Sequence, residues 1–352
     1  MTSVHQTGRA RRTPRAHLRA PAALIAAAFA VLATSAAPAF AADPSPADQK
    51  PLPVAIVDTL NKLSGGPHAG FRANHAKGVL VAGTFTPAPD AAAFSKAAHF
   101  AKTVPVQVRF SNATGVPNLP DADPNASAHG VAIRFQLPDG ASTDIVSISA
   151  NDFPVATPEE FLGLLQAVAQ SGAGVAKPTP IEQFLGSHPA ALRFVTTPRP
   201  APDSFGTLAF YGVNAFKFTN AKGVSQFARY QILPVAGEHS LSAADAAKAA
   251  PNYLMDELPA RIAKSPVQFR LLAQLAKEGD SVNDPTSVWP ADRKLVELGT
   301  ISLTSTSNEQ MKEQKALLFN PLSLPAGIEP SADPVLLARP AAYGVSYGQR
   351  LQ

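Results

Sequence analysis

Residues 130–149 read GVAIRFQLPDGASTDIVSIS, which is typical of two β-strands joined by a tight turn. Strand-forming β-branched and aromatic residues occur from Gly130 to Leu137 and from Ser142 to Ser149. Between them, Pro138-Asp139-Gly140 has the composition of a turn. Similar segments recur along the chain, and they predict further strands at 79–85, 104–111, 207–210, 215–219, 226–233, 267–275 and 297–303. We therefore expect an antiparallel sheet that curves into a barrel.

Helices are expected before, between and after these strands. Residues 54–63 have a helical spacing of apolar side chains and end at Ser64-Gly65-Gly66-Pro67, which breaks a helix. Thr157-Pro158-Glu159-Glu160 has the pattern of a capping box with proline in the first turn, so it predicts a helix start. The remaining predicted helices are 242–250, 254–264 and one near the C-terminus. Together with the sheet, they place the chain in the α+β class.

The first 41 residues differ in composition from the rest of the chain. Five arginines without an acidic residue precede an apolar run at 22–33, and Ala39-Phe40-Ala41 has the small-x-small pattern of a cleavage site. We expect a secretory leader at 1–41, a flexible junction at 42–53 and a single domain at 54–352.

This leader predicts an exported protein that is periplasmic or secreted after cleavage near Ala41. The general secretory route and the twin-arginine route both stay open, because Arg11-Arg12 is followed by a sequence that fits the second route poorly. An uncleaved amphipathic anchor is the alternative to cleavage.

Charge and cysteine content exclude several classes of function. The formal net charge is +4 for the whole chain and −1 without the five leader arginines. No later stretch concentrates lysine and arginine with aromatic residues, so the electrostatic pattern of a nucleic-acid-binding protein is missing. The chain contains no cysteine, which excludes disulfides, thiolate nucleophiles and thiolate-bound metal clusters.

A stripe of one tyrosine and two arginines is predicted at the C-terminus. In an α-helix, Arg339, Tyr343 and Arg350 would lie within about 40° of one another around the helix axis. Pro340 is an objection, because proline can kink or start a helix at that position. A cation one turn away favours the phenolate form of tyrosine, which is a hard anionic ligand for ferric iron. The alternative is an ordinary packing pair four residues apart on a helix.

Motifs upstream of this stripe resemble segments of the haem catalases, and they occur in the order of that family. They are Phe71–Gly78 with the following strand, Val104–Ser111, His129–Phe135, and Asp284–Pro290 followed by Val296–Leu303. The resemblance extends from about Val54 to the C-terminus and is strongest to the short, exported catalase-related peroxidases. It implies a catalase-type antiparallel β-barrel core with surrounding helices, a C-terminal helix that carries the haem ligand, and haem b as the cofactor.

The resemblance also implies roles for individual residues. Tyr343 would be the axial ligand of the haem iron and would pair with Arg339. His75 would be the distal base that moves the proton of peroxide. Ser111 would orient His75, and Asn151 would donate a hydrogen bond to bound peroxide. The residues implied to contact the rest of the haem are Arg72, Arg109 and Arg350 at its propionates and Phe161 at the porphyrin face.

The sequence departs from the family pattern at several places. His129 stands where catalases usually have arginine, and Asn151-Asp152-Phe153-Pro154 replaces the usual Asn-Asn-x-Pro. The sequence continues for nine residues after Tyr343, whereas large catalases continue into a wrapping segment and a helical domain. We therefore expect no NADPH site, and a monomer or dimer in place of a threaded tetramer.

The expected function is that of a haem peroxidase, an oxidoreductase with peroxide as acceptor. It would reduce organic hydroperoxides and hydrogen peroxide with a small organic electron donor, and it would have a weak catalase side activity. The changes at His129 and Asp152 keep open a non-catalytic haem-binding or carrier protein on the catalase fold. Rearrangement of a hydroperoxide and a haem-free solute-binding protein are further alternatives.

Overall fold

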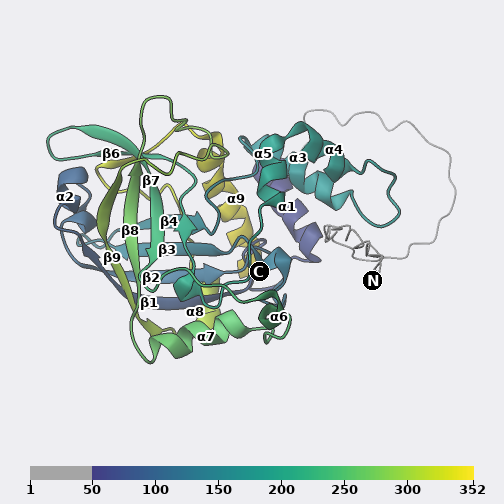
Figure 1. Ribbon diagram of the computed structural model, residues 1–352, viewed down its shortest axis with the longest axis horizontal. Helices are drawn as coiled ribbons and strands as arrows, with labels where there is room; N and C mark the ends of the chain where they lie inside the picture. Colours follow the sequence, from purple (N-terminus) through teal and green to yellow (C-terminus); the bar gives the residue numbers. More distant parts are fainter. Residues whose placement is uncertain (1–49) are drawn as a thin grey trace, which may run out of the picture.

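The computed structural model describes residues 50–352, which fold into a barrel flanked by helices (Figure 1). In this part of the chain ten strands form one antiparallel sheet, in the order β10-β6-β7-β5-β4-β3-β2-β1-β9-β8. A further pairing of β7 with β8 closes eight of the strands into a barrel, and β6 and β10 extend the sheet. The predicted α+β class and barrel are confirmed. The strands are β1 Gly78–Pro87, β2 Val104–Ser111, β3 Gly130–Gln136, β4 Ser142–Ile148, β5 Phe210–Tyr211, β6 Phe216–Thr219, β7 Ser225–Pro234, β8 Val267–Leu275, β9 Leu295–Thr306 and β10 Ile328–Pro330.

The hairpin of β3 and β4 has two chemically different faces. Ile133 pairs with Ile145 on the face that points into the barrel, whereas Ala132 pairs with Val146 on the outer face. This follows from strand geometry, because successive side chains of a strand point to opposite sides of the sheet. The same few residues therefore help to form both the core and the outer wall of the barrel.

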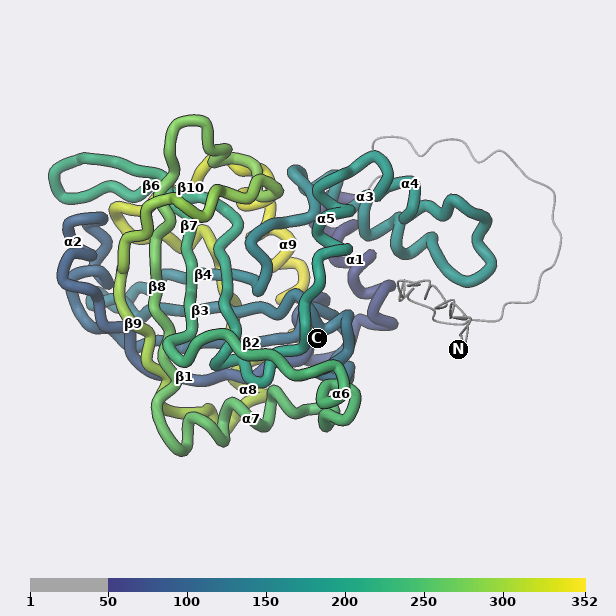
Figure 2. Tube along the Cα trace, in the orientation of Figure 1, coloured from purple at the N-terminus to yellow at the C-terminus, as the bar shows by residue number. Residues whose placement is uncertain are grey.

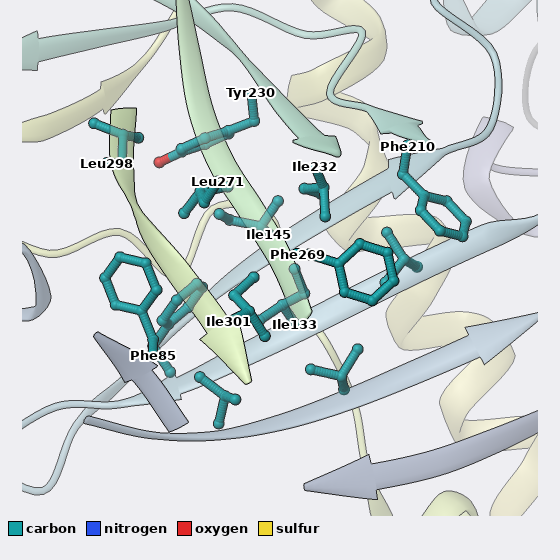
Figure 3. Packing of buried hydrophobic residues seen from close by; sticks show 14 of the residues in the cluster. Phe85, Ile133, Ile145, Phe210, Tyr230, Ile232, Phe269, Leu271, Leu298 and Ile301 are labelled. Carbon is teal, nitrogen blue, oxygen red and sulfur yellow. The ribbon is translucent and has the colours of Figure 1, made fainter. Parts of the chain in front are cut away.

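Buried apolar side chains fill the interior of the barrel (Figure 3). An eight-stranded barrel encloses a space that side chains can fill completely. The large cavity of the molecule accordingly lies outside the barrel, against the outer face of β2, β3 and β4. The labelled members of the core are Phe85, Ile133, Ile145, Phe210, Tyr230, Ile232, Phe269, Leu271, Leu298 and Ile301.

Three helices lie together beside the barrel, namely α1 (Leu52–Ser64), α3 (Pro158–Ala169) and α9 (Pro334–Leu351) (Figures 1 and 2). After α3 the chain continues into α4 (Pro180–Ser187), which packs against α3, and α5 (Pro189–Thr196), which packs against α4. The remaining helices are α2 Ala91–Phe94, α6 Ala243–Ala246, α7 Tyr253–Ile262 and α8 Gln310–Ala316. Among the helices of residues 50–352, none has the length and apolar character needed to cross a membrane.

The N-terminal predictions fall mostly outside the described residues. The predicted leader at 1–41 and positions 42–49 of the predicted junction lie there, so both stay predictions. The first element of the described part is α1, close to the helix predicted at 54–63.

Two predicted elements are wrong in extent. The sequence predicts a strand at 207–210, where the structure has the 3₁₀ turn Phe205–Thr207 followed by the two-residue strand β5. The hydroxyl of Ser204 accepts a hydrogen bond from the Gly206 N–H and stabilises this turn. The helix predicted at 242–250 is reduced to α6, and Pro251 follows, which disfavours helical conformation in the residue before it.

Helix α9 continues through Pro340 without interruption. Asp333 caps its start, because one carboxylate oxygen accepts hydrogen bonds from the Val335 and Leu336 N–H groups at 2.9 and 3.2 Å. Pro340 therefore does not separate Arg339 from Tyr343, and the two side chains meet.

We predict that Gly299→Ala destabilises the barrel. Gly299 has a φ of 151° beside the irregularity in the β8–β9 pairing, and a Cβ atom there would lie 2.3 Å from the main-chain oxygen of Thr86. Because this clash can be relieved only by moving β1 against β9, we expect a loss of about 3 kcal/mol or more in the free energy of unfolding, measured by urea denaturation.

Gly140→Ala is the matched control. Gly140 also has a positive φ, of 85°, but a Cβ atom there would have no neighbour within 4 Å. We expect this variant to lose only about 1 to 2 kcal/mol. Equal losses in the two variants would contradict the importance of the contact at Thr86.

Candidate active site

A large cavity lies between the outer face of the barrel and the helices α1, α3 and α9. Its internal volume is about 260 Å³, near the lower end of the range of about 300 to 1,000 Å³ typical of ligand pockets. The cavity therefore has the size of a ligand-binding site. The predicted site residues that line it are Arg72, His75, Arg109, Ser111, Phe161, Arg339, Tyr343 and Arg350.

His75 is held tightly at the barrel wall of this cavity. Its Nδ1 atom lies 3.1 Å from the hydroxyl oxygen of Ser111 on β2. Gly130 on β3 allows this approach, because a Cβ atom there would lie 2.8 Å from the same Nδ1. His75 also has a φ of 56°, in the left-handed region that side chains other than glycine rarely adopt. The surrounding structure therefore imposes both the backbone conformation and the ring position of His75.

The environment of His75 keeps its ring neutral. Burial lowers its pKa to about 3, with a further contribution from the charge of Arg109, while a hydrogen bond to the main chain of Asn112 acts in the opposite direction. A neutral imidazole has one ring nitrogen that can accept a proton. His75 thus presents a neutral ring to the cavity.

On the helical wall, Arg339 and Tyr343 form a close pair. The Nε and Nη2 groups of Arg339 donate hydrogen bonds to the phenol oxygen of Tyr343 at 3.0 and 2.9 Å. The Nη1 group donates to the side-chain oxygen of Asn214 at 2.6 Å, and the amide of Asn214 donates to Asp333 at 2.6 Å. The phenol oxygen of Tyr343 is therefore fixed in position at the wall of the cavity.

Asn214 is a site residue that sequence reasoning missed. It is buried, lines the cavity, and connects the cap of α9 to Arg339. A single asparagine between two short strands is by default a turn residue, so the sequence contains no signal for this role.

Three arginines gather at another part of the cavity, namely Arg72, Arg109 and Arg350. Burial, followed by the charges of Arg109 and Arg350, lowers the pKa of Arg72 to about 7. Burial and the charge of Arg350 lower the pKa of Arg109 to about 9, and burial lowers the pKa of Arg350. The Nε atom of Arg350 is buried and lacks a hydrogen-bond partner among residues 50–352. An anion placed among these cations would relieve their repulsion.

Aromatic side chains form an apolar part of the cavity. The rings of Phe153 and Phe161 are 5.5 Å apart between centroids, and both line the cavity. Asn151, two residues before Phe153, is half-buried and is not one of the lining residues in the described part of the chain. Its role as a donor to peroxide stays a prediction.

The two departures from the family pattern have clear structural partners. Asp152 accepts a hydrogen bond from Arg193 of α5 at 3.1 Å, and Arg193 also donates to the Thr286 carbonyl. His129 is buried, with its Nδ1 atom 3.2 Å from the side-chain oxygen of Asn112. Burial lowers the pKa of His129 to about 4. Both residues therefore support the loops that shape the cavity.

Comparison with known proteins identifies the family. The sequence matches the Catalase family profile over residues 69–352. The chain belongs to the catalase family. A crystal structure titled as a fungal catalase matches with a TM-score of 0.72 at 24% sequence identity, covering 81% of this chain and 60% of that one. This match confirms the predicted catalase-type barrel.

Two similar relatives are short members of the catalase family, each named Catalase-related peroxidase. The protein from Mycolicibacterium paratuberculosis is 39% identical over 287 residues, which are 80% of this chain and 90% of the relative. The protein from Synechococcus elongatus is 33% identical over 298 residues, with coverages of 83% and 87%. Mouse catalase is 28% identical over 298 residues, and the match spans only 56% of its length. The predicted resemblance to catalase-related peroxidases is confirmed.

Members of the catalase family typically bind haem, and the cavity fits this group. Tyr343 supplies an oxygen that can bind ferric iron. The three arginines, including the unpaired Nε of Arg350, supply donors for two carboxylates. Phe153 and Phe161 supply apolar contact for a flat ring system. The donor set and the aromatic lining of the cavity thus agree with an iron porphyrin.

The buried histidines predict an acid-sensitive fold. His75, His99 and His129 have pKa values of about 3, 3 and 4, each lowered mainly by burial from an ordinary value of 6.5. Below pH 6.5 the unfolded chain binds more protons at these sites than the folded chain, so stability falls as the pH falls from about 6.5 toward 4.

Urea unfolding at pH 7.5 and pH 5.0 measures this effect. We expect a loss of about 1 to 2 kcal/mol for each buried histidine. His99 lies in an aromatic cluster with Phe85, Phe100 and Phe135, away from the cavity lining. His99→Phe should remove about a third of the pH dependence. A pH dependence that this variant leaves unchanged would contradict the burial of a neutral His99.

Proposed function

We propose that this protein is an exported peroxidase that uses haem b. It reduces organic hydroperoxides and hydrogen peroxide with a small organic electron donor, and it has a weak catalase side activity. The names of the two short relatives and the family membership support a peroxide-acting oxidoreductase. The single observation that carries the proposal is the placement of a neutral, fixed His75 and an arginine-bound Tyr343 in one cavity.

On the helical wall, Tyr343 would hold the haem iron. Bound haem would supply a ferric centre that takes up the oxidising equivalents of peroxide. The two hydrogen bonds from Arg339 stabilise negative charge on the phenol oxygen and so favour its bond to iron. Asp333 and Asn214 keep the guanidinium of Arg339 in place. Arg72, Arg109 and Arg350 would bind the haem propionates, and Phe161 would lie against the porphyrin face.

On the barrel wall, His75 would move the proton of peroxide. Cleavage of the O–O bond requires a proton to leave one oxygen and reach the other, and the neutral imidazole can accept it from the first and donate it to the second. Ser111 and Gly130 fix the ring position for both transfers. We assign Asn151 a hydrogen bond to the departing oxygen.

The apolar part of the cavity supports the inclusion of organic substrates. Ile56, Val57 and Leu60 of α1 line the cavity together with Phe153 and Phe161. Apolar side chains favour carbon-bearing hydroperoxides and donors over water, because burying apolar surface is favourable. A monomer or dimer, and export after cleavage near Ala41, are part of the proposal.

A non-catalytic haem carrier on the same fold is the second candidate, and His75 argues against it. A carrier needs Tyr343 and the arginines but no base. A histidine at a φ of 56° has a conformational cost, which proteins retain mainly at functional sites. A catalytic role for His75 would account for this conformational cost.

The variant His75→Ala tests the proposed function. Purified haem-loaded protein is mixed with hydrogen peroxide or cumene hydroperoxide in a stopped-flow absorbance experiment, with and without a phenolic donor. We expect the variant to keep its haem and to react with peroxide about 10²- to 10⁴-fold more slowly, because a positioned general base contributes a factor of this size.

The control is His99→Phe, which removes a buried histidine outside the cavity and should react at the rate of the unmodified protein. An unchanged rate in His75→Ala would disprove the base role. Haem binding without any peroxide-dependent absorbance change in the unmodified protein would favour the carrier.

A further inference from the structure

Three of the arginines that line the cavity, Arg72, Arg109 and Arg350, have only neutral hydrogen-bond partners among residues 50–352. Arg72 and Arg350 donate to the same carbonyl oxygen, that of Leu317, at 2.8 and 3.0 Å. Arg109 donates to the Ala76 carbonyl at 3.0 Å and to the side-chain oxygen of Gln314 at 2.7 Å. No ion pair joins any of the three to a carboxylate within residues 50–352. Their positive charge is therefore left uncompensated by the protein.

Other buried cations in the chain have acidic neighbours. Lys77 pairs with Asp121 at 2.6 Å, and Arg134 pairs with Asp144 at 2.7 Å. Arg229 donates only to carbonyls, yet the charges of nearby acids, Asp333 foremost, raise its pKa against the effect of burial. Lys77, Arg134 and Arg229 are thus compensated by acidic residues, whereas Arg72, Arg109 and Arg350 are not.

Gln314 on α8 is the neutral side chain that accepts the hydrogen bond from Arg109. It is buried, and its amide nitrogen donates to the Gly78 carbonyl at 3.1 Å and to the Gln310 side-chain oxygen at 2.8 Å. Because two acceptors face the NH₂ group, the amide oxygen must face Arg109. An amide satisfies both sides at once. A glutamate in this place would face two acceptors with one oxygen and would cancel the charge of Arg109 with the other.

Helix α8 is itself fixed to the barrel at this point. The side chain of Gln310 accepts from the Leu80 N–H at 2.8 Å and donates to the Leu80 carbonyl at 2.6 Å, as a neighbouring strand would. Gly78 brings β1 close to Arg109, because a Cβ atom there would lie 2.6 Å from the guanidinium carbon. The start of β1 therefore fixes the position of Gln314, and Gln314 in turn fixes the position of Arg109.

We propose that Gln314 is a positioning residue that orients Arg109 by a neutral hydrogen bond and so keeps its full charge available to the carboxylates of bound haem. This inference rests on the proposed function, because it takes haem as the anion. In this arrangement the protein gives the cavity a net positive charge, and this charge would face the two carboxylates of bound haem. The charge would stabilise bound haem and would raise the ferric/ferrous midpoint potential relative to a compensated site.

Two substitutions separate the charge effect from the loss of a hydrogen bond. Gln314→Glu keeps an acceptor for Arg109 but cancels its charge, whereas Gln314→Met removes the acceptor and leaves the charge. Ferric haem b affinity is measured by transfer of haem to excess apomyoglobin, and the midpoint potential is measured by spectroelectrochemistry. Lys312→Gln is the control for net charge, because Lys312 lies on the same helix, is exposed and pairs only with Glu309 in the described chain.

We expect Gln314→Glu to lower haem affinity by about tenfold or more and to lower the midpoint potential, since a unit charge near the ligand is worth at least this factor at an effective dielectric constant of about 20. Gln314→Met should lose about threefold or less, as for a single neutral hydrogen bond, and should keep the potential. Lys312→Gln should change neither quantity. Circular dichroism and the urea midpoint of the haem-free variants check folding.

The reverse order would overturn the inference, because a purely structural acceptor role predicts that glutamate is milder than methionine. If Gln314→Glu does not fold, the methionine variant still decides. A loss of affinity as large as that in Arg109→Met would then mean that Gln314 acts through structure alone. Failure of the unmodified protein to bind haem would instead remove the proposed function, so the two failures are distinguishable.

Discussion

Two N–H groups of one guanidinium converge on the phenol oxygen of Tyr343, and much of the site is arranged to keep them there. Both residues lie on α9, one turn apart, so their meeting requires an unbroken helix across Pro340. The third donor of Arg339 is fixed by Asn214, which in turn contacts the residue that caps α9. Hydrogen bonds thus connect the cap residue Asp333, the loop residue Asn214 and the pair of Arg339 and Tyr343.

The inner face of the barrel forms the core, and its outer face forms one wall of the cavity. Alternate residues of β2, β3 and β4 fill the core, and the residues between them line the cavity, so the packing that stabilises the fold also positions Ser111 and Gly130 beside His75. Because side chains fill the barrel interior, the cavity lies between the outer face of the barrel and the helices α1, α3 and α9, which supply further side chains. Base, ligand oxygen and cations therefore come from distant parts of the chain.

Local patterns in the sequence predicted much of this arrangement. Alternation identified β2, β3 and β4 almost to the residue, and Thr157-Pro158 with Glu160 correctly marked the start of α3. The resemblance to catalases identified the lining residues at His75, Ser111, Tyr343 and the arginines before any distance was known. The start of α4 carries an equally clear capping box at Thr179 with Glu182, so the sequence also contains a signal for this helix.

Other features could not be predicted because they depend on pairing between distant segments. The closure of β7 on β8, and the irregular strand at Phe210, follow from register in three dimensions. Asn214 and Gln314 act only through partners more than a hundred residues away, at Arg339 and Arg109, and neither lies in a recognisable motif. The placement of Asn151 outside the cavity lining depends on the loop that Arg193 and Asp152 hold.

Resonance Raman spectroscopy of the ferric haem-loaded protein tests whether Tyr343 binds the haem iron through its oxygen. We expect phenolate ring vibrations enhanced through an iron–oxygen bond, and we expect Tyr343→Phe to abolish them. Haem that binds in the cavity without these vibrations, or vibrations that persist in Tyr343→Phe, would contradict the assignment.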